Sequence, residues 1–208
     1  MKTFMRLVAP AVIAFGVTTE AAAIFDVQFM AGRRTGTWTH RAAAVNVEKD
    51  ASIDELQVGF HLDPIPLVPI SFGLSIDIDN YSSPETHGFT VLHGISLQPE
   101  IQVWWPLGDL KPYARVGYAI DALKGTATNT TTATPAEYDV ILGGTGVHVG
   151  LGVKYNVIPF LALLVEYNLG FEKVKTQTAD AGGVDLKDSY PAFDFNTNAF
   201  LIGVQLGL

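Results

Sequence analysis

The stretch from Gly146 to Phe171, GVHVGLGVKYNVIPFLALLVEYNLGF, alternates apolar residues with glycine and with small or polar residues. Successive side chains of a β-strand point to opposite faces, so a period of two puts Val147, Val149 and Leu151 on one face. In a soluble protein the opposite face would carry the lysine and glutamate that face water, but here it is mostly glycine. The pattern therefore favours an apolar face in lipid and a small, polar face inside a closed barrel.

The same alternation recurs along the chain. Period-two runs are found at about residues 24–33, 53–63, 69–79, 95–105, 110–123, 146–155, 160–171 and 199–208. Short turns at about 64–69, 106–109 and 156–159 alternate with long polar connections at about 34–52, 80–92, 123–143 and 173–195. Bacterial outer-membrane barrels have an even number of strands, short periplasmic turns and long external loops. The sequence thus predicts an all-β protein, a transmembrane eight-stranded antiparallel up-and-down β-barrel with periplasmic termini and extracellular loops.

A secretory signal peptide is predicted at the N-terminus. Lys2 and Arg6 precede an apolar run, and Ala21 and Ala23 end the segment with a small-residue cleavage pattern. The apolar run is too short for a membrane helix, which needs about 20 residues. We therefore expect residues 1–23 to be removed and the rest of the chain to lie beyond the inner membrane.

Composition supports one membrane-embedded domain at 24–208. Charged residues make up 16% of the chain, against a typical value of about 25%. The net charge of −8 argues against nucleic acid as a partner. No composition break marks a second domain, so the barrel is expected to fill the chain after the signal peptide.

A lipocalin is the main soluble alternative with eight strands. Its apolar face surrounds a ligand and its charged face is outside. In this sequence the apolar faces carry no charge. The opposite faces hold Asp26, His61, Asp77, Glu100, Arg115, Asp121, Lys154 and Glu166. Because a lysine or arginine facing lipid at mid-membrane costs about 2–4 kcal/mol, this segregation favours the membrane barrel.

Two motifs resemble a known family. The segment LKPYARVGYAI, from Leu110, resembles the PY-x-x-x-G strand opening of small outer-membrane barrels. The Gly146–Phe171 stretch resembles the G-x-G-x-x-Y … P-x-L-x-L-x-x-E-Y hairpin of the outer-membrane protein A superfamily, which includes X-type and W-type proteins. The resemblance implies an eight-stranded barrel inserted by the outer-membrane assembly machinery, which would engage Phe200–Leu208. Such chains usually end in phenylalanine, whereas this one ends in Leu208. Relatives of the A type often carry a peptidoglycan-binding domain after the barrel, and none is expected here.

Four inward-facing residues are predicted to form a charged network in the lumen. Counting back from the short turns places Glu100 near Arg115 and His148 near Glu166, all at one level of the barrel. Eight strands leave an interior that side chains can fill. The network is therefore either a gate that breaks and re-forms or a permanent buried support for a closed lumen. Breaking a buried ion pair costs about 3–5 kcal/mol, which favours the permanent support.

No catalytic residue, metal site or cofactor is expected. His61 lies near Ser71 across a short turn, but a serine inside the lumen cannot reach lipid. The other histidines that could bind a metal with Glu85 lack regular ligand spacing: His40, His87 and His93. The glycine-rich segment from Gly143 has neither a dinucleotide-binding nor a phosphate-binding spacing.

Aromatic residues lie where a barrel wall meets the membrane interface. Trp105, Tyr155 and Phe160 are at or beside short turns, where rings are stable at the head-group level. Trp38 falls within the first predicted long loop. The expected partners are outer-membrane lipids, including lipopolysaccharide, and the expected state is a monomer.

Two functions are consistent with these features. One is a structural barrel that presents surface loops and maintains the outer membrane. The other is a narrow channel, or a lateral conduit for small or apolar solutes, as a W-type resemblance would imply. Because side chains are expected to fill the lumen of an eight-stranded barrel, the structural function is favoured.

Overall fold

The computed structural model describes residues 25–42, 45–63, 69–82, 89–105, 107–129, 136–181, 184–185 and 192–207. The predicted signal peptide, residues 1–23, lies outside these ranges. In the part of the chain that the structure describes, no helix is long and apolar enough to cross a membrane.

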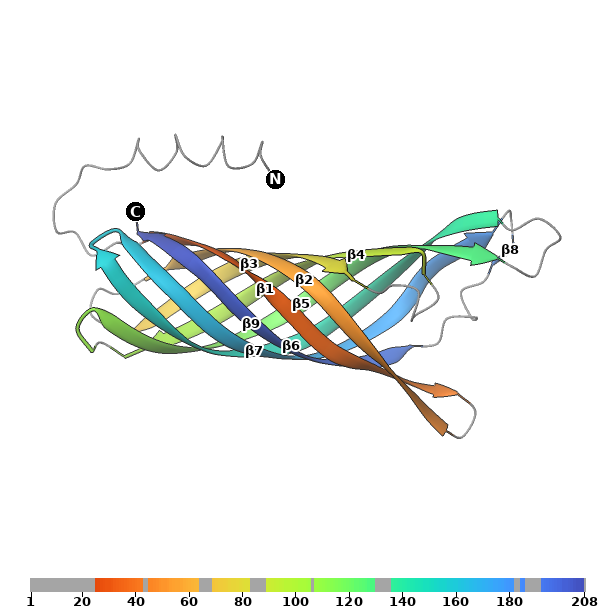
Figure 1. Cartoon of the computed structure of the whole chain (residues 1–208), viewed down its shortest axis with the longest axis horizontal. Coiled ribbons are helices and arrows are strands. Elements are labelled where there is room, and N and C mark those ends of the chain that lie inside the picture. The colour runs from red at the N-terminus through yellow and green to blue at the C-terminus, as the bar shows by residue number, and fades with distance from the viewer. Residues whose placement is uncertain are drawn as a thin grey trace.

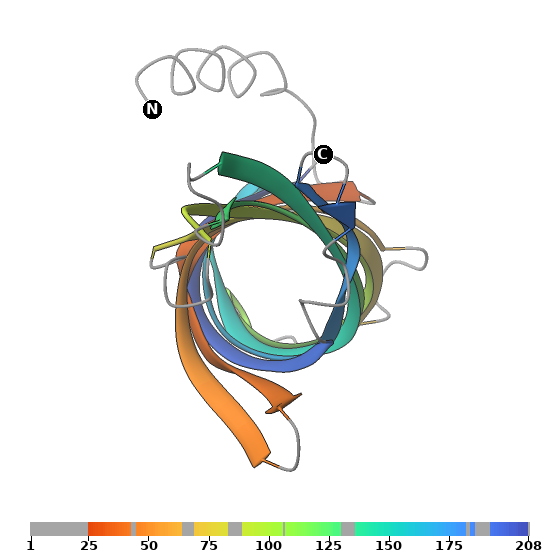
Figure 2. The ribbon, with the colours of Figure 1, turned by 90° about the vertical axis from the view of Figure 1, so that its right-hand side faces the viewer.

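The strands form one closed antiparallel ring, which confirms the predicted fold class (Figure 2). In chain order they are β1 (Phe25–Ala42), β2 (Val45–Leu62), β3 (Ile70–Tyr81), β4 (Val91–Trp104), β5 (Leu110–Asn129), β6 (Ala136–Ile158), β7 (Leu161–Ala181), β8 (Val184–Asp185) and β9 (Phe193–Gly207). Each strand from β1 to β7 pairs with the next, and β9 pairs with both β7 and β1, which closes the barrel. The short β8 pairs with the end of β7, so the wall consists of the other eight strands.

The strands are steeply inclined to the barrel axis. Residues of one strand are paired with residues of the next strand. When these pairs are followed from Asp26 on β1 around the whole ring, the path returns to β1 at Gly36, ten residues further along the strand. An offset of this kind is required for strands to tilt and close into a narrow barrel. As a consequence, residues at one height inside the barrel are usually not ladder partners, and their side chains meet diagonally.

Apolar side chains cover the outside of the barrel, and polar side chains point inward. Ile101 and Val116 are 48% and 53% exposed, whereas their neighbours Glu100 and Arg115 are 4% and 2% exposed. The same alternation holds along β4, whose exposed and buried residues follow one another from Val91 to Glu100. A polar interior within an apolar wall suits a barrel whose solvent is lipid.

The long connections differ from the prediction, because strands continue through much of them. β1 and β2 stay paired from Phe25–Leu62 to Ala42–Val45, so most of 34–52 is a hairpin. β5, β6 and β7 likewise extend into the predicted loops at 123–143 and 173–195. These extensions lie at the end of the barrel opposite the C-terminus (Figure 1). The apolar alternation stops at the outward residues Thr35 and Thr37, but backbone pairing does not need it and continues to Ala42.

The β4–β5 and β6–β7 turns lie at the same end of the barrel as the C-terminus (Figure 1). Gly108 sits in the β4–β5 turn with a φ of 70°, a conformation that favours glycine. In the β6–β7 hairpin, Ile158 pairs with Leu161, which places the turn at Pro159 and Phe160. The predicted turn at 156–159 was therefore centred too early in the chain.

Candidate functional site in the barrel interior

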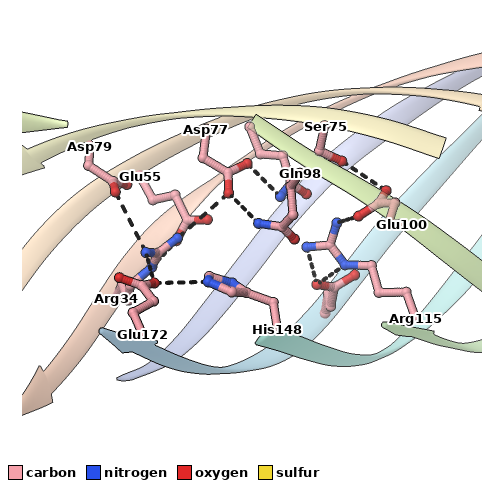
Figure 3. A network of polar contacts seen from close by, with 12 residues as sticks. Arg34, Glu55, Ser75, Asp77, Asp79, Gln98, Glu100, Arg115, His148 and Glu172 are labelled. Carbon is pink, nitrogen blue, oxygen red and sulfur yellow. Dashed lines mark hydrogen bonds and ion pairs between the residues drawn. The ribbon is translucent and has the colours of Figure 1, made fainter. Parts of the chain in front are cut away.

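Arg115 joins two carboxylates across the interior (Figure 3). Its Nη1 lies 2.8 Å from Glu100 Oε2 on β4. Its Nη2 lies 2.7 Å from Glu166 Oε1 on β7, and its Nε donates to the same oxygen at 2.8 Å. The hydroxyl of Tyr113 donates to Glu166 Oε2 at 2.9 Å. Three residues of the predicted network thus come together from β4, β5 and β7.

Two inward glycines of β6 make room for this cluster. A Cβ on Gly150 would lie 2.7 Å from Glu166 Oε1 and 2.8 Å from Arg115 Cγ. A Cβ on Gly152 would overlap the ring of Tyr113. Glycine is therefore needed at Gly150 and Gly152 because β6 passes directly beside the ion pairs, and not because of backbone conformation.

His61 connects the Arg115 cluster to the end of the barrel with the short turns. Its Nε2 lies 2.6 Å from Glu100 Oε1, and its Nδ1 lies 3.2 Å from Asp26 Oδ1. Ser75 also donates to Glu100 Oε1, at 2.8 Å. Glu100 therefore has partners on β2, β3 and β5, which ties three strands to one buried carboxylate.

A second arginine, Arg34 on β1, organises a larger acidic cluster (Figure 3). Its closest partners are Glu55 Oε2 at 3.0 Å and Glu172 Oε1 at 3.2 Å. Asp79 and Asp77 follow at 3.6 and 3.7 Å. Arg34 is 2% exposed, and its four carboxylate partners come from β2, β3 and β7. This second cluster was not predicted from the sequence.

Amides join the clusters of Arg34 and Arg115. Gln57 donates to Asp77 Oδ1 at 2.7 Å, and Gln98 donates to Asp77 Oδ2 at 3.0 Å. Gln98 lies on β4 two residues from Glu100, so one strand contributes to both clusters. The result is a polar network that spans the width of the barrel over several residues of height.

His148 does not contact Glu166, contrary to the prediction. Its Nε2 lies 2.8 Å from Glu172 Oε1, in the Arg34 cluster. The ladder pairs His148 with Gly170 and Glu166 with Gly152, so the two residues lie four positions apart along β6 and β7. The cause is the later turn at Pro159 and Phe160, which shifts the register from the one predicted.

The other predicted lumen residues also point inward. Asp26, His61 and Asp77 are 5%, 1% and 0% exposed, and Lys154 is 8% exposed. Asp121 is partly buried. The interface aromatics at the short-turn end have exposed rings: Trp105 and Tyr155 are 50% and Phe160 is 45% exposed.

An apolar layer fills the interior on the other side of Arg34. Trp38 is 5% exposed and belongs to β1, so its assignment to a loop was wrong. Its ring stacks on Phe193 with centroids 4.1 Å apart. It also makes edge contacts with Phe195 and Tyr81 at 5.6 and 5.8 Å. Further buried members of this layer are Ile53, Phe89, Leu92, Leu123, Leu142 and Val174.

The described interior offers charge pairing between buried side chains. Among the described residues, no group of three or more histidine or acidic side chains could hold a metal ion. Ser71 donates its hydroxyl to Asp63, whereas both ring nitrogens of His61 face carboxylates. His87 and Glu85 lie outside the described residues.

Comparison with protein families gives one match over nearly the whole chain. The profile of the family described as outer membrane protein beta-barrel domain matches residues 7–207. No curated protein matches the sequence.

Several solved structures share the fold at low sequence identity. Neisserial surface protein A aligns with a TM-score of 0.52 and 13% identity, over 91% of this chain and all of that one (100%). The outer membrane protein OprG of Pseudomonas aeruginosa aligns with a TM-score of 0.52 and 9% identity, over 89% and 97%. The outer membrane protein AlkL, solved in lipid bilayers, aligns with a TM-score of 0.57 and 12% identity, over 92% and 93%.

Proposed function

This chain belongs to the outer membrane protein beta-barrel domain family, and we propose that it is a structural member of that family with a closed lumen. It spans the bacterial outer membrane, holds its hairpin extensions at the cell surface and helps to maintain the membrane. The observation that carries this proposal is the joining of non-adjacent strands inside the barrel by the ion pairs of Arg34 and Arg115. Arg34 on β1 pairs with carboxylates on β2 and β7, and Arg115 on β5 pairs with carboxylates on β4 and β7.

The energetics of buried charge support a permanent network. Removing one partner of a buried ion pair leaves an unpaired charge at a cost of about 3–5 kcal/mol. Arg115 has two carboxylate partners at 2.7 and 2.8 Å, and opening the lumen would require both contacts to break. A gate that opens readily would need weaker contacts than these.

The apolar layer around Trp38 supplies a second barrier in series with the charged clusters. Hydrophobic constrictions exclude water and ions by dewetting. Trp38, Phe193 and Phe195 bring three rings together inside the barrel. Ions passing through the lumen would therefore have to cross both an apolar layer and two ion-paired clusters.

The proposed orientation places the C-terminus and short turns in the periplasm. They lie at one end of the barrel, and the extended hairpins lie at the other (Figure 1). Small outer-membrane barrels have short periplasmic turns and longer extracellular segments. The proposal also includes insertion by the assembly machinery through Phe200–Leu208, a monomeric state, contacts with lipopolysaccharide and no catalytic activity.

Conductance across a planar bilayer tests the closed lumen. We expect protein purified from membranes to give a silent bilayer, and Arg115→Ala to remain silent while it loses stability. The alternative function, a narrow channel, predicts discrete openings of the wild-type protein or of Arg115→Ala. A lateral conduit for apolar solutes predicts a silent bilayer together with faster uptake of an apolar solute by liposomes that contain the protein. Either positive result would overturn the structural proposal.

A further inference from the structure

A groove lies on the barrel near the start of the hairpin extensions. Its volume is about 980 Å³, and its lining comes from β1, β5, β6, β7 and the beginning of β9. On the outward face it is lined by apolar and cationic side chains. The residues used below are Ile120, Ala122, Ile141, Gly143, Lys173 and Lys175.

Small residues and a bulge shape the centre of the groove. Gly143 on β6 pairs with Ala122 on β5 and with Lys175 on β7, so little side-chain volume projects from β5 and β6 there. The pairing of β6 with β7 is irregular beside Gly143. Ile141 pairs with Thr178, but Leu142 pairs with Thr176, so β7 has one extra residue at this point. A Cβ on Gly143 would lie 2.9 Å from the side-chain amide of Gln177. A larger residue at Gly143 would therefore fill the notch.

The floor of the groove is apolar, and one side is cationic. Ile120 and Ile141 are 50% and 44% exposed. Lys173 and Lys175 point outward on β7 and are exposed. Among the described residues neither lysine forms an ion pair, although Asp194 lines the same groove as the ladder partner of Lys173. Asp121 also lines the groove but lies on the inward face, as the ladder partner of the buried Ser96, so the outward face carries two ammonium groups against one carboxylate.

The groove straddles the boundary between the apolar band and the polar extensions. On β7 the outward residue before Lys173 is Phe171, which is 54% exposed. On β5 the outward residues run from Ile120 through Ala122 to Lys124. Lipid head groups lie at such a boundary, because the wall changes there from lipid-facing to water-facing. A ligand in the groove would thus have acyl chains below and an anionic group above.

We propose that this groove binds lipid A, the phosphorylated lipid anchor of lipopolysaccharide in the outer leaflet. An acyl chain lies along Ile120 and enters the notch at Gly143, and Ile141 flanks that notch on the side of the hairpin extensions. A phosphate pairs with Lys173 and Lys175, as basic residues do with anionic lipids next to a membrane surface. This site deepens the proposed function and rests on its orientation, with the hairpin extensions at the cell surface.

Native mass spectrometry of the purified full-length barrel tests the site. Delipidated protein would be incubated with lipid A, with dephosphorylated lipid A and with phosphatidylglycerol. We expect wild-type protein to retain lipid A, and the double variant Lys173→Gln, Lys175→Gln to lower its affinity about 10- to 30-fold. Gly143→Leu should lower it as well, with both lysines intact. The control Lys111→Gln changes a lysine that stacks on Trp104 at the short-turn end and should bind as wild type does.

Two results would overturn the site. One is unchanged lipid A affinity in the double lysine variant. The other is equal retention of dephosphorylated lipid A or phosphatidylglycerol by the wild-type protein. Each variant would first be shown to be folded by its heat-modifiable migration on a gel. Conductance and cysteine labelling give separate readouts, so a failure of the groove is distinguishable from a failure of the closed lumen or of the orientation.

Discussion

Arg115 Nη1 lies 2.8 Å from Glu100 Oε2, although the two residues are not ladder partners. The ladder pairs Arg115 with Gln102 and Glu100 with Gly117. The contact is diagonal because the strands are inclined, so a side chain reaches a position two residues further along the neighbouring strand. The inclination of the barrel thus determines which charges meet inside it.

The first prediction concerns the removal of this cation. Arg115→Ala would leave Glu100 and Glu166 buried at 4% and 1% exposure without their shared partner. We expect the free energy of unfolding to fall by about 3–5 kcal/mol, the cost of an uncompensated buried charge. Urea titration of the purified barrel in lipid vesicles, followed by tryptophan fluorescence, measures this change.

An exposed ion pair provides the control for Arg115→Ala. Lys124 Nζ lies 2.7 Å from Asp139 Oδ2, with side chains 64% and 57% exposed. Exposed pairs contribute about 0–1 kcal/mol, so Lys124→Ala should change stability little. Equal losses in the two variants would contradict a special role for the buried network.

The second prediction concerns the close approach of β6 to the Arg115 cluster. Gly150→Ala would place a methyl group 2.7 Å from Glu166 Oε1 and 2.8 Å from Arg115 Cγ. We expect overpacking to lower stability by about 1–3 kcal/mol. Gly143→Ala is the matched control, because the atom it would meet is the mobile end of Gln177. The same urea titration applies, and a stable Gly150→Ala barrel would show that the cluster can shift at little cost.

The third prediction tests the orientation. A cysteine at Asn129, at the end of β5, should react with an impermeant maleimide on intact cells. One at Gly108, in the β4–β5 turn, should react only after the outer membrane is permeabilised. The native chain has no cysteine, so each variant carries a single label site. Labelling of Gly108 alone on intact cells would reverse the proposed topology.

The barrel was predictable from the sequence because lipid imposes a strict alternation on the wall. Residues such as Ile101 and Val116 must be apolar, and their inward neighbours need not be. The continuation of the strands into the predicted loops was not predictable in the same way. The outward residues Thr35 and Thr37 are polar, so the pattern resembles that of a loop although β1 continues to Ala42.

The interior was only partly predictable. Glu100, Arg115 and Glu166 followed from the alternation and from approximate turn positions. The partner of His148 did not, because it depends on whether the β6–β7 turn is at 156–159 or at Pro159–Phe160. Arg34 was missed because it fell at the edge of a predicted loop. Arg34 is an even number of residues along β1 from Asp26 and Gln28, which point inward. This spacing was the available signal that Arg34 points inward as well.

The last prediction concerns the apolar layer. Trp38→Ala would remove a ring that stacks on Phe193 with centroids 4.1 Å apart and contacts Phe195 and Tyr81 edge-on. We expect the free energy of unfolding to fall by about 3–5 kcal/mol, as for large-to-small changes in packed interiors. Trp38→Phe keeps an aromatic ring and should lose less.

The same variant separates the two barriers in the lumen. The Arg34 cluster begins four residues before Trp38 on β1 and remains intact in Trp38→Ala, with Glu55 and Glu172 at 3.0 and 3.2 Å from the guanidinium. Because that cluster still crosses the interior, Trp38→Ala should keep a planar bilayer silent while it lowers stability. Channel openings in Trp38→Ala, but not in the wild-type protein, would show that the aromatic layer alone closes the lumen. In that case the ion pairs of Arg34 and Arg115 would support the wall without blocking the path.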